Sequence, residues 1–321
     1  MTRLYATTGD GFARLDEERG WTVDLALADT GAQCVAADPR EPDSVYVGCR
    51  GGGLRRSDDA GASWADLALP QPDVFSVAVS PVDGAVYAGC EPSMLFRSTD
   101  RGDTWEELQA LRELPSAPTW SFPPRPWTSH VRWIAPSPHD AAVLLVGIEL
   151  GGLMRTEDGG RTWADHAPGA QKDVHSLAWH PSIEGRAYEA GGGGSAWSAD
   201  GGRTWRPADE GRDRHYTWAV VPDPADPDRW FVSASPGPFQ AHRAGRADAY
   251  VYRWQGEGPW ERLDGGLPQP LDAMPYALAF AGERLFAGLA DGRLFSSGDR
   301  GTMWAQVSVA GLPAITALVP G

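Results

Sequence analysis

The segment WTSHVRWIAP, residues 127–136, combines two ionisable side chains with the composition of a buried strand. Its apolar residues occupy both faces of the expected strand, and a strand of that kind usually lies inside a sheet. An imidazole or a guanidinium in that position needs a polar partner or it costs stability. His130 and Arg132 are therefore the first candidates for a functional site, because perturbed ionisable groups cluster where chemistry requires them.

His130 also belongs to a wider set of side chains that suits metal or acid–base chemistry. Neutral imidazoles and carboxylates together hold divalent ions of zinc, iron, manganese or copper and leave coordination positions open. Such an ion activates water or polarises a carbonyl, an arginine binds an anionic group of the substrate, and a tyrosine donates a proton. The predicted metal ligands are His130, His175, His242 and Glu149, and the predicted catalytic residues are His130, His175, Arg132, Glu149, Tyr216 and Tyr276.

The same residues also have a structural interpretation. Arg132 could simply pair with Glu149, and the histidines could bind backbone carbonyls, because polar groups inside a channel often bind only one another and water. The chain contains no GxxxxGK[ST] loop and no HExxH, GxSxG or CxxC motif. Nucleotide-binding, zincin and serine-hydrolase chemistry therefore has no support in the sequence.

The composition limits the partners and the compartment. The formal net charge is -15, which repels phosphate backbones and anionic lipid surfaces, so we expect neither a nucleic acid nor a membrane as a partner. Lys172 is the only lysine, which leaves one candidate for amine chemistry. The N-terminus has no basic segment followed by an apolar core, and three cysteines do not suit a disulfide framework. We therefore expect a cytoplasmic protein.

Self-comparison of the chain reveals an eight-residue repeat, SxDxGxxW. Glycine permits a tight turn, the aspartate carboxylate accepts turn N–H groups, and the tryptophan anchors the next strand by packing. Trp21 and Trp260 hold the corresponding place in two degenerate copies, which makes seven units. The five full copies are SDDAGASW at 57–64, STDRGDTW at 98–105, TEDGGRTW at 156–163, SADGGRTW at 198–205 and SGDRGTMW at 297–304.

This octapeptide resembles the Asp-box, or BNR repeat, of sialidases, sortilin-type ectodomains, xyloglucanases and photosystem assembly factors. In those families the repeat lies in the turn between the third and fourth strands of a propeller blade, and the resemblance covers essentially the whole chain. It implies an all-β fold, a single seven-bladed propeller with four antiparallel strands per blade. It implies little about activity, because one propeller architecture carries many chemistries.

Each unit fits four short strands, for example VFSVAVSP, AVYAGC, LFRSTD and TWEEL between residues 74 and 108. The chain starts with segments that suit the second and third strands of a unit and ends with PAITALVP, which suits a first strand. We therefore predict that the C-terminal strand completes the N-terminal blade and closes the ring, which leaves no exposed edge. In this interpretation residues 1–321 form one domain with insertions at 111–129 and 235–248.

A proline near the end of each first strand offers a common reference point, with Ala281 in its place in one unit. Strand direction then puts the start of every first strand and both insertions on the face opposite the Asp-boxes. Counting back six residues from the reference predicts a ring of side chains around the central channel, Gln33, Phe75, His130, His175, Tyr216 and Ala314. Tyr276, five residues before Ala281, is assigned to the same ring. The ionisable residues expected on the same face are Arg50, Glu91, Glu149, Asp173, Glu189, Arg214 and His215.

The predicted site at this channel mouth favours a hydrolase or lyase that acts on a small anionic or carbohydrate-like ligand, with or without a metal. Long connections that break a repeat are often functional loops, and both insertions lie on this side. A non-catalytic binding or assembly propeller with a protein partner is the alternative. A sialidase is less favoured because the Arg-Ile-Pro motif of that family is absent. Xyloglucanases pair two such domains, whereas this chain has one.

Overall fold

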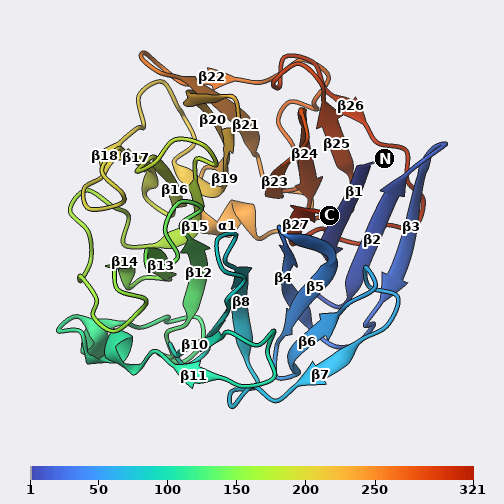
Figure 1. Cartoon of the computed structure of the whole chain (residues 1–321). Coiled ribbons are helices and arrows are strands. Elements are labelled where there is room, and N and C mark those ends of the chain that lie inside the picture. The colour runs from blue at the N-terminus through green and yellow to red at the C-terminus, as the bar shows by residue number, and fades with distance from the viewer. Residues whose placement is uncertain (1) are drawn as a thin grey trace.

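The computed structural model describes residues 2–321 and shows seven antiparallel sheets arranged in a ring (Figure 1). The inner strands surround a central channel, and the outer strands form the rim of the ring. This arrangement confirms the predicted seven-bladed propeller. The blades are numbered here in chain order, and blade 1 is the one that contains the N-terminal strand.

The strands have the following bounds. Blade 1 contains β1 (Thr2–Thr7), β2 (Phe12–Glu17), β3 (Trp21–Ala26) and β27 (Ala317–Pro320), blade 2 contains β4 (Ala32–Asp38), β5 (Glu41–Cys49), β6 (Gly53–Ser57) and β7 (Ala65–Leu67), and blade 3 contains β8 (Val74–Val79), β9 (Val86–Cys90), β10 (Leu95–Ser98) and β11 (Glu106–Glu107). Blade 4 contains β12 (Val131–Pro136), β13 (Leu144–Ile148) and β14 (Gly152–Thr156), and blade 5 contains β15 (Val174–Trp179), β16 (Ala187–Gly191), β17 (Gly194–Ser198) and β18 (Arg206–Pro207). Blade 6 contains β19 (Tyr216–Asp223), β20 (Asp226–Ser235), β21 (Tyr250–Gln255) and β22 (Glu261–Arg262), and blade 7 contains β23 (Pro275–Ala281), β24 (Arg284–Leu289), β25 (Leu294–Ser297) and β26 (Ala305–Gln306).

The C-terminal strand closes the ring, as the sequence predicts. β27 pairs antiparallel with β1, with Thr7 opposite Ala317 and Leu4 opposite Pro320. The hydroxyl groups of Thr7 and Thr316 lie 2.9 Å apart beside this pairing. Blade 1 thus gains its inner strand from the last residues of the chain, and the inner edge of β1 is covered.

Blade 4 departs from the four-strand pattern. Its fourth strand is reduced to an isolated antiparallel bridge between Arg155 and Ala164, which follows the Asp-box of that blade. The shortened outer edge lies next to the first insertion, which carries two 3-10 helices, η1 (Gln109–Glu113) and η2 (Ala117–Thr119). Ser116 of this insertion bonds to Asp165 through its backbone N–H and its hydroxyl group. The insertion therefore braces blade 4 where regular pairing stops.

Glycines in the second strands allow neighbouring blades to approach closely. A Cβ atom on Gly147 of β13 would lie 2.4 Å from a Val174 methyl carbon in blade 5, and one on Gly89 of β9 would lie 2.5 Å from a Val131 methyl carbon in blade 4. In these blades the first apolar residue of the inner strand thus packs directly on the backbone of the preceding blade. This contact fixes where the side chains at the start of each inner strand are held.

The Asp-boxes stabilise turns at the opposite end of the blades. In the third full copy, Asp158 Oδ1 accepts the backbone N–H of Thr162 at 2.9 Å and Asp158 Oδ2 accepts the Thr162 hydroxyl group at 2.6 Å. These hydrogen bonds lower the pKa of Asp158 to about 2. The Trp163 indole N–H donates to the Gly160 carbonyl at 3.1 Å and closes the turn. Asp158, Thr162 and Trp163 thus all bind within their own turn, which fits a role in folding.

A β-bulge near the start of the inner strand selects the side chains that line the channel mouth. In β12 the register shifts between Val131 and Trp133, so Arg132 is the extra residue. In β15 the shift lies between Val174 and Ser176, which makes His175 the equivalent of Arg132. We call the residues at the six bulges the bulge ring: Gln33, Phe75, Arg132, His175, Trp218 and Tyr276.

The bulge ring corrects the alignment that was based on prolines. That alignment places His130 level with His175, whereas the strand pairing places Arg132 there. The reason is that Pro136 is the last residue of β12, whereas Pro181 lies beyond the end of β15, so the prolines do not mark a constant level. His130 instead precedes β12 and corresponds to Asp173, the residue before β15.

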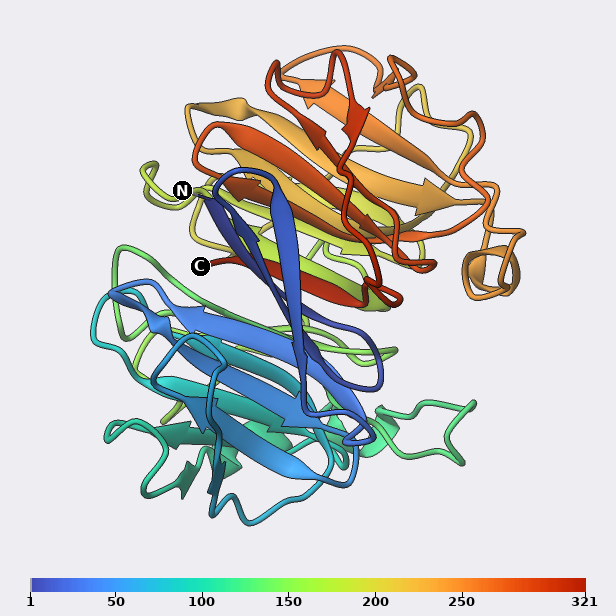
Figure 2. The same cartoon turned by 90° about the vertical axis from the view of Figure 1, so that its right-hand side faces the viewer.

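The two insertions project from one face of the ring. Figure 2 shows the segment around α1 (Pro238–Ala241, orange) and the green loop of the first insertion on the same side, away from the C-terminus. The structure thus agrees with the sequence in placing both insertions on one face. Within residues 2–321, no helix has the length and apolar character needed to cross a membrane.

Candidate active site at the channel mouth

Glu149 lies at the centre of a buried polar cluster on this face. It follows the last residue of β13 directly, and the next residue, Leu150, has a φ of 56° that reverses the chain. His130 Nε2 lies 2.6 Å from Glu149 Oε2, and Arg132 Nε lies 3.6 Å from the same oxygen. Three of the predicted site residues therefore meet at one carboxylate.

The charge state of Glu149 follows from these contacts. Burial opposes ionisation, but the hydrogen bond from His130 and the charge of Arg132 outweigh it and lower the pKa of Glu149 to about 2. The carboxylate is therefore ionised at neutral pH and can serve as a ligand or a hydrogen-bond acceptor, not as a general acid. Both contacts use Oε2, which leaves Oε1 for another partner.

His130 bridges two carboxylates. Its Nδ1 lies 3.3 Å from Glu91 Oε2 while its Nε2 contacts Glu149, and the ring stacks on Phe75 with 3.9 Å between the ring centroids. Arg125 from the first insertion lies 3.0 Å from the other oxygen of Glu91. His130 thus contacts Glu149 through Nε2, whereas its buried Nδ1 makes no hydrogen bond within residues 2–321 although Glu91 Oε2 lies 3.3 Å away.

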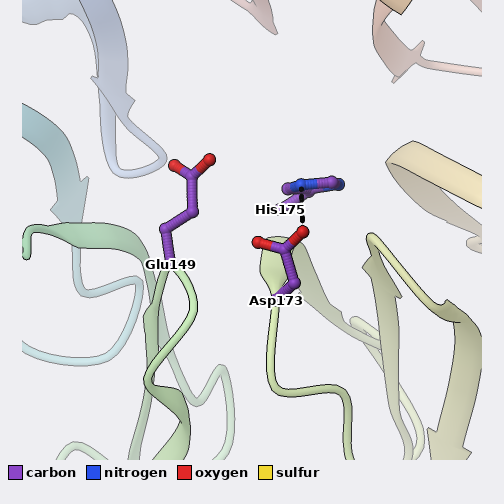
Figure 3. Close-up of side chains that lie close together, drawn as sticks. All are labelled: Glu149, Asp173 and His175. Atoms are coloured by element: carbon purple, nitrogen blue, oxygen red, sulfur yellow. Dashed lines mark ion pairs between the residues drawn. The ribbon is translucent and has the colours of Figure 1, made fainter. Parts of the chain in front are cut away.

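His175 presents the opposite situation. Its Nδ1 lies 2.6 Å from the carbonyl oxygen of Thr217, and because a carbonyl only accepts, Nδ1 carries the proton. Its Nε2 is buried and has no hydrogen-bond partner within residues 2–321, and it faces Asp173 Oδ2 at 3.5 Å (Figure 3). A lone pair that faces a carboxylate requires a proton or a metal ion between the two atoms.

Glu149, Asp173 and His175 could together hold that ion. Each offers one ligand atom, and these atoms lie within 4.8 Å of one another. Two of the three are predicted ligands, and Asp173 is new in this role. The surrounding charges also favour a cation, because four carboxylates, those of Asp73, Glu91, Glu149 and Asp173, outnumber the two guanidinium groups of Arg125 and Arg132.

His242 belongs to a separate hydrogen-bonded chain. Its Nε2 lies 2.8 Å from the Tyr216 hydroxyl group and its Nδ1 lies 2.8 Å from the Tyr276 hydroxyl group, which donates in turn to the Ala241 carbonyl at 3.2 Å. Because Tyr276 donates to that carbonyl, it accepts from Nδ1–H, and Nε2 then accepts from Tyr216. Both nitrogens of His242 are used, so the structure does not place it among the metal-binding atoms.

The two tyrosines of this chain remain protonated. Burial raises the pKa of Tyr276 to about 12 and raises the pKa of Tyr216 further. Burial also lowers the pKa of His242, although part of its ring remains in contact with solvent. At neutral pH the chain therefore consists of two phenols and a neutral imidazole, and its hydrogen-bond donors bind one another and the Ala241 carbonyl.

Trp218 connects the two clusters and is not among the predicted site residues. Its ring lies 4.5 Å from that of His175 and 4.9 Å from that of His242, and the Arg132 guanidinium carbon lies 4.7 Å from its centroid. The position follows from the bulge ring, which replaces Tyr216 by Trp218 at this level. The pentapeptides AQCVA, VFSVA, VRWIA, VHSLA and PYALA contain the signal, since their second residues are members of that ring.

Glu189 is the predicted face residue that lies elsewhere. It is within β16, fully buried, and paired in register with Leu177 and Ala196. Its Oε2 accepts the backbone N–H of Gln171 at 2.9 Å, and its Oε1 has no partner within the described chain. Burial raises the pKa of Glu189 to about 8. This carboxyl group is therefore part of the blade interior and not of the channel mouth.

Comparison with known proteins establishes the fold. No protein-family model matches the chain, and no curated protein matches it. Among solved structures, an ancestral GH74 enzyme is similar over 94% of this chain and 40% of its own, with 18% identity and a TM-score of 0.64. The GH74 enzyme of Niastella koreensis is similar over 94% of this chain and 46% of its own, with 15% identity and a TM-score of 0.66.

YCF48 bound to a D1 peptide is similar over 86% of this chain and 81% of its own, with 19% identity and a TM-score of 0.61. This chain shares their propeller fold. At 15% to 19% identity the likeness concerns the fold alone, and this chain spans less than half the length of either GH74 enzyme. The site must therefore be interpreted from its own residues.

Proposed function

We propose that the channel mouth is the active site of a metal-dependent hydrolase or lyase that acts on a small anionic substrate. The observation that supports this most is His175 Nε2, a buried nitrogen without a hydrogen-bond partner in the described chain, which faces Asp173. The carbonyl oxygen of Thr217 fixes its tautomer in the manner typical of metal-binding histidines.

The three ligand atoms fit a divalent ion after a small closing movement. Ligands about 2.1 Å from a zinc ion lie about 3 to 4 Å apart, and the observed separations are within 4.8 Å. Rotation of the Glu149 and Asp173 carboxylates toward His175 would complete such a site. Zinc, iron, manganese and copper all suit one imidazole and two carboxylates. When bound, the ion would supply an activated water molecule or polarise a carbonyl group.

The remaining residues of the site would bind and orient the substrate. Arg132, held beside Trp218, provides the positive charge for a carboxylate group. Tyr276 belongs to the bulge ring, and its protonated phenol would donate to the substrate once it releases the Ala241 carbonyl, to which it donates at 3.2 Å in this structure. His130 positions Glu149 through its 2.6 Å contact.

Zinc titration tests the proposal. Isothermal titration calorimetry of chelator-treated protein with zinc chloride should show one bound ion, and His175→Ala or Asp173→Asn should weaken binding at least ~10-fold. His139→Ala is the matched control, because this histidine is exposed and lies 3.3 Å from the His180 carbonyl, outside the metal cluster. Zinc-dependent release of 4-nitrophenol from mono-4-nitrophenyl succinate would then demonstrate hydrolysis. Absence of zinc binding, or binding that His175→Ala does not change, would overturn the proposal.

A binding propeller is the second candidate, and two exposed aromatic residues favour it. Trp127 and Phe239 are 71% and 73% exposed, and they belong to the two insertions that project from the site face. Aromatic side chains of this kind often anchor a peptide or protein partner. The fold serves both purposes, since GH74 proteins are enzymes and YCF48 is seen with a D1 peptide. Zinc binding without turnover of any ester would support this second candidate.

A further inference from the structure

A cavity of about 570 Å³ fills the central channel. One end is formed by members of the bulge ring, among them Arg132, Trp218 and Tyr276, and the wall continues along the inner strands to Pro320 and Gly321. These last two residues are exposed. The cavity therefore leads from the solvent at the Asp-box face to the level of the candidate active site, and its size is that of a pocket for a small organic ligand.

The wall between the two ends is largely apolar. Each inner strand contributes aliphatic side chains, for example Val77 from β8, Ile134 from β12 and Leu278 from β23. An apolar wall is poorly hydrated, so an apolar molecule gains by replacing water there. The strands that make this wall are held by the packing between blades, so the cavity is formed before any ligand arrives.

Arg132 provides a positive charge at the end of the cavity formed by the bulge ring. Arg132 borders the cavity, its side chain is 18% exposed, and its buried Nε has no hydrogen-bond partner within residues 2–321. The 3.6 Å separation from Glu149 is longer than a hydrogen bond. Trp218 supports the guanidinium from one side with 4.7 Å between Cζ and the ring centroid. The guanidinium group of Arg132 therefore has hydrogen-bond donors without partners and can bind an anion in the channel.

The second insertion lies at the opposite end of the channel. Figure 1, which looks along the channel, draws α1 over the central opening, and Figure 2 shows this segment projecting beyond the blades on one face. The hydroxyl group of Tyr276 in the bulge ring donates to the Ala241 carbonyl at the end of α1, and His242 links the same segment to Tyr216. These contacts tie the α1 segment to Tyr216 and Tyr276 beside the channel, and the cavity wall itself continues toward Pro320 and Gly321 at the Asp-box end.

We propose that the channel binds an amphiphilic carboxylate, which enters from the Asp-box face with its apolar body in the channel and its carboxylate on Arg132. The reaction at this site is the one given by the proposed function, on which this inference rests. The inference adds the class of substrate. It also reverses the direction of access that the sequence predicts, because the insertions then cover the catalytic end and the substrate approaches through the propeller. Binding in the channel can be measured without any turnover.

Two matched probes test the charge requirement. 1-Naphthaleneacetate and 1-naphthaleneacetamide have nearly the same size and apolar body, and they differ in charge. By calorimetry the acid should bind at least ~10-fold more tightly than the amide, since a hydrogen bond to a charged group contributes that much. Arg132→Gln should remove this preference by weakening the acid alone. Arg55→Gln is the control, because Arg55 pairs with exposed Asp66 on an outer strand.

A second pair of variants tests the location. Ala37 lines the cavity and is only partly buried, so Ala37→Trp should place an indole ring in the channel. It should weaken both probes at least ~10-fold, as expected for a ligand whose site is occupied by an indole ring. Ala65→Trp places the same ring on an exposed outer strand and should change neither affinity.

The outcomes separate this inference from the proposed function. Equal affinity for the acid and the amide, no binding of either probe, or unchanged binding to Ala37→Trp would each overturn the channel site. Zinc titration of Ala37→Trp should remain as in the unaltered protein, because Ala37 is not among the metal-binding residues. If His175→Ala loses zinc binding but still binds the probes, the channel site exists independently of metal binding.

Discussion

Replacing Glu189 by glutamine should change how the stability of the protein depends on pH. The folded protein buries this carboxyl group completely and gives it one backbone N–H as a partner, and no cation within residues 2–321 pairs with it. An ionised carboxylate in that environment would be strongly destabilising. The folded chain therefore retains a proton on Glu189 at pH values at which the unfolded chain has lost it.

The size of the effect follows from the two pKa values. The ordinary pKa of a glutamate is 4.5, and burial raises that of Glu189 to about 8. Between these values the folded state holds one extra proton, so the free energy of unfolding decreases by about 1.4 kcal/mol per pH unit, about 5 kcal/mol in all. This contribution to stability is fully present below pH 4.5 and has been lost above about pH 8.

Glu189→Gln keeps an acceptor for the Gln171 N–H group but cannot ionise. Its amide N–H group would lack an acceptor, at a cost of about 1 to 3 kcal/mol that is the same at every pH. The variant should therefore be less stable than the unaltered protein at pH 5 and more stable at pH 9. Urea unfolding followed by tryptophan fluorescence at pH 5, 7 and 9 measures this crossing.

Glu184→Gln is the matched control, because Glu184 is exposed and should not alter the pH dependence. Other groups of the protein also titrate in this range, but they contribute equally to both chains and cancel in the difference. Parallel stability curves for Glu189→Gln and the unaltered protein would refute the reasoning, since Glu189 would then be ionised in the folded state.

Three further predictions concern the fold. Asp158→Ala removes the acceptor for both Thr162 contacts and should lower the free energy of unfolding by about 1 to 3 kcal/mol without changing zinc affinity; a loss of zinc affinity at unchanged stability would contradict a folding role. Deletion of residues 312–321 removes β27 from blade 1 and should abolish cooperative unfolding, which a sigmoidal melt of the truncated chain would disprove. Gly147→Ala places a Cβ atom 2.4 Å from Val174 and should cost about 1 to 3 kcal/mol by overpacking; the double variant with Val174→Ala should recover part of this loss, and additive losses would argue against a direct contact.

The sequence predicts the architecture because local chemistry repeats. The spacing of serine, aspartate, glycine and tryptophan marks one turn in each blade, and the final segment PAITALVP has the character of a missing inner strand. Each of these sequence patterns involves only a few neighbouring residues, so substitutions elsewhere in the chain do not obscure it. The number of blades, the Asp-box turns and the closure by β27 could therefore be predicted without coordinates.

The site was predictable in part. Strand direction brings His130, Arg132 and Glu149 to one end of the channel, but their levels depend on a one-residue bulge that proline positions do not reveal. Which nitrogen of a histidine is free depends on a carbonyl from another blade, as with His175 and Thr217. The sequence places Glu189 on the site face, because nothing local indicates that its side chain is fully buried within β16.

The bulge ring has a consequence for how this molecule can acquire new specificity. Each member stands at a break in the strand pairing, so its side chain is free of the alternation that fills the blade interiors. Substituting one member changes one segment of the channel wall and leaves the packing motif of its blade intact. The residues that would contact a ligand are thus different from those that stabilise the blades. The ligand-contacting residues lie far apart along the chain. A combinatorial library that varies only the bulge ring would yield variants that bind new ligands, because other residues of the chain determine the folding of the propeller.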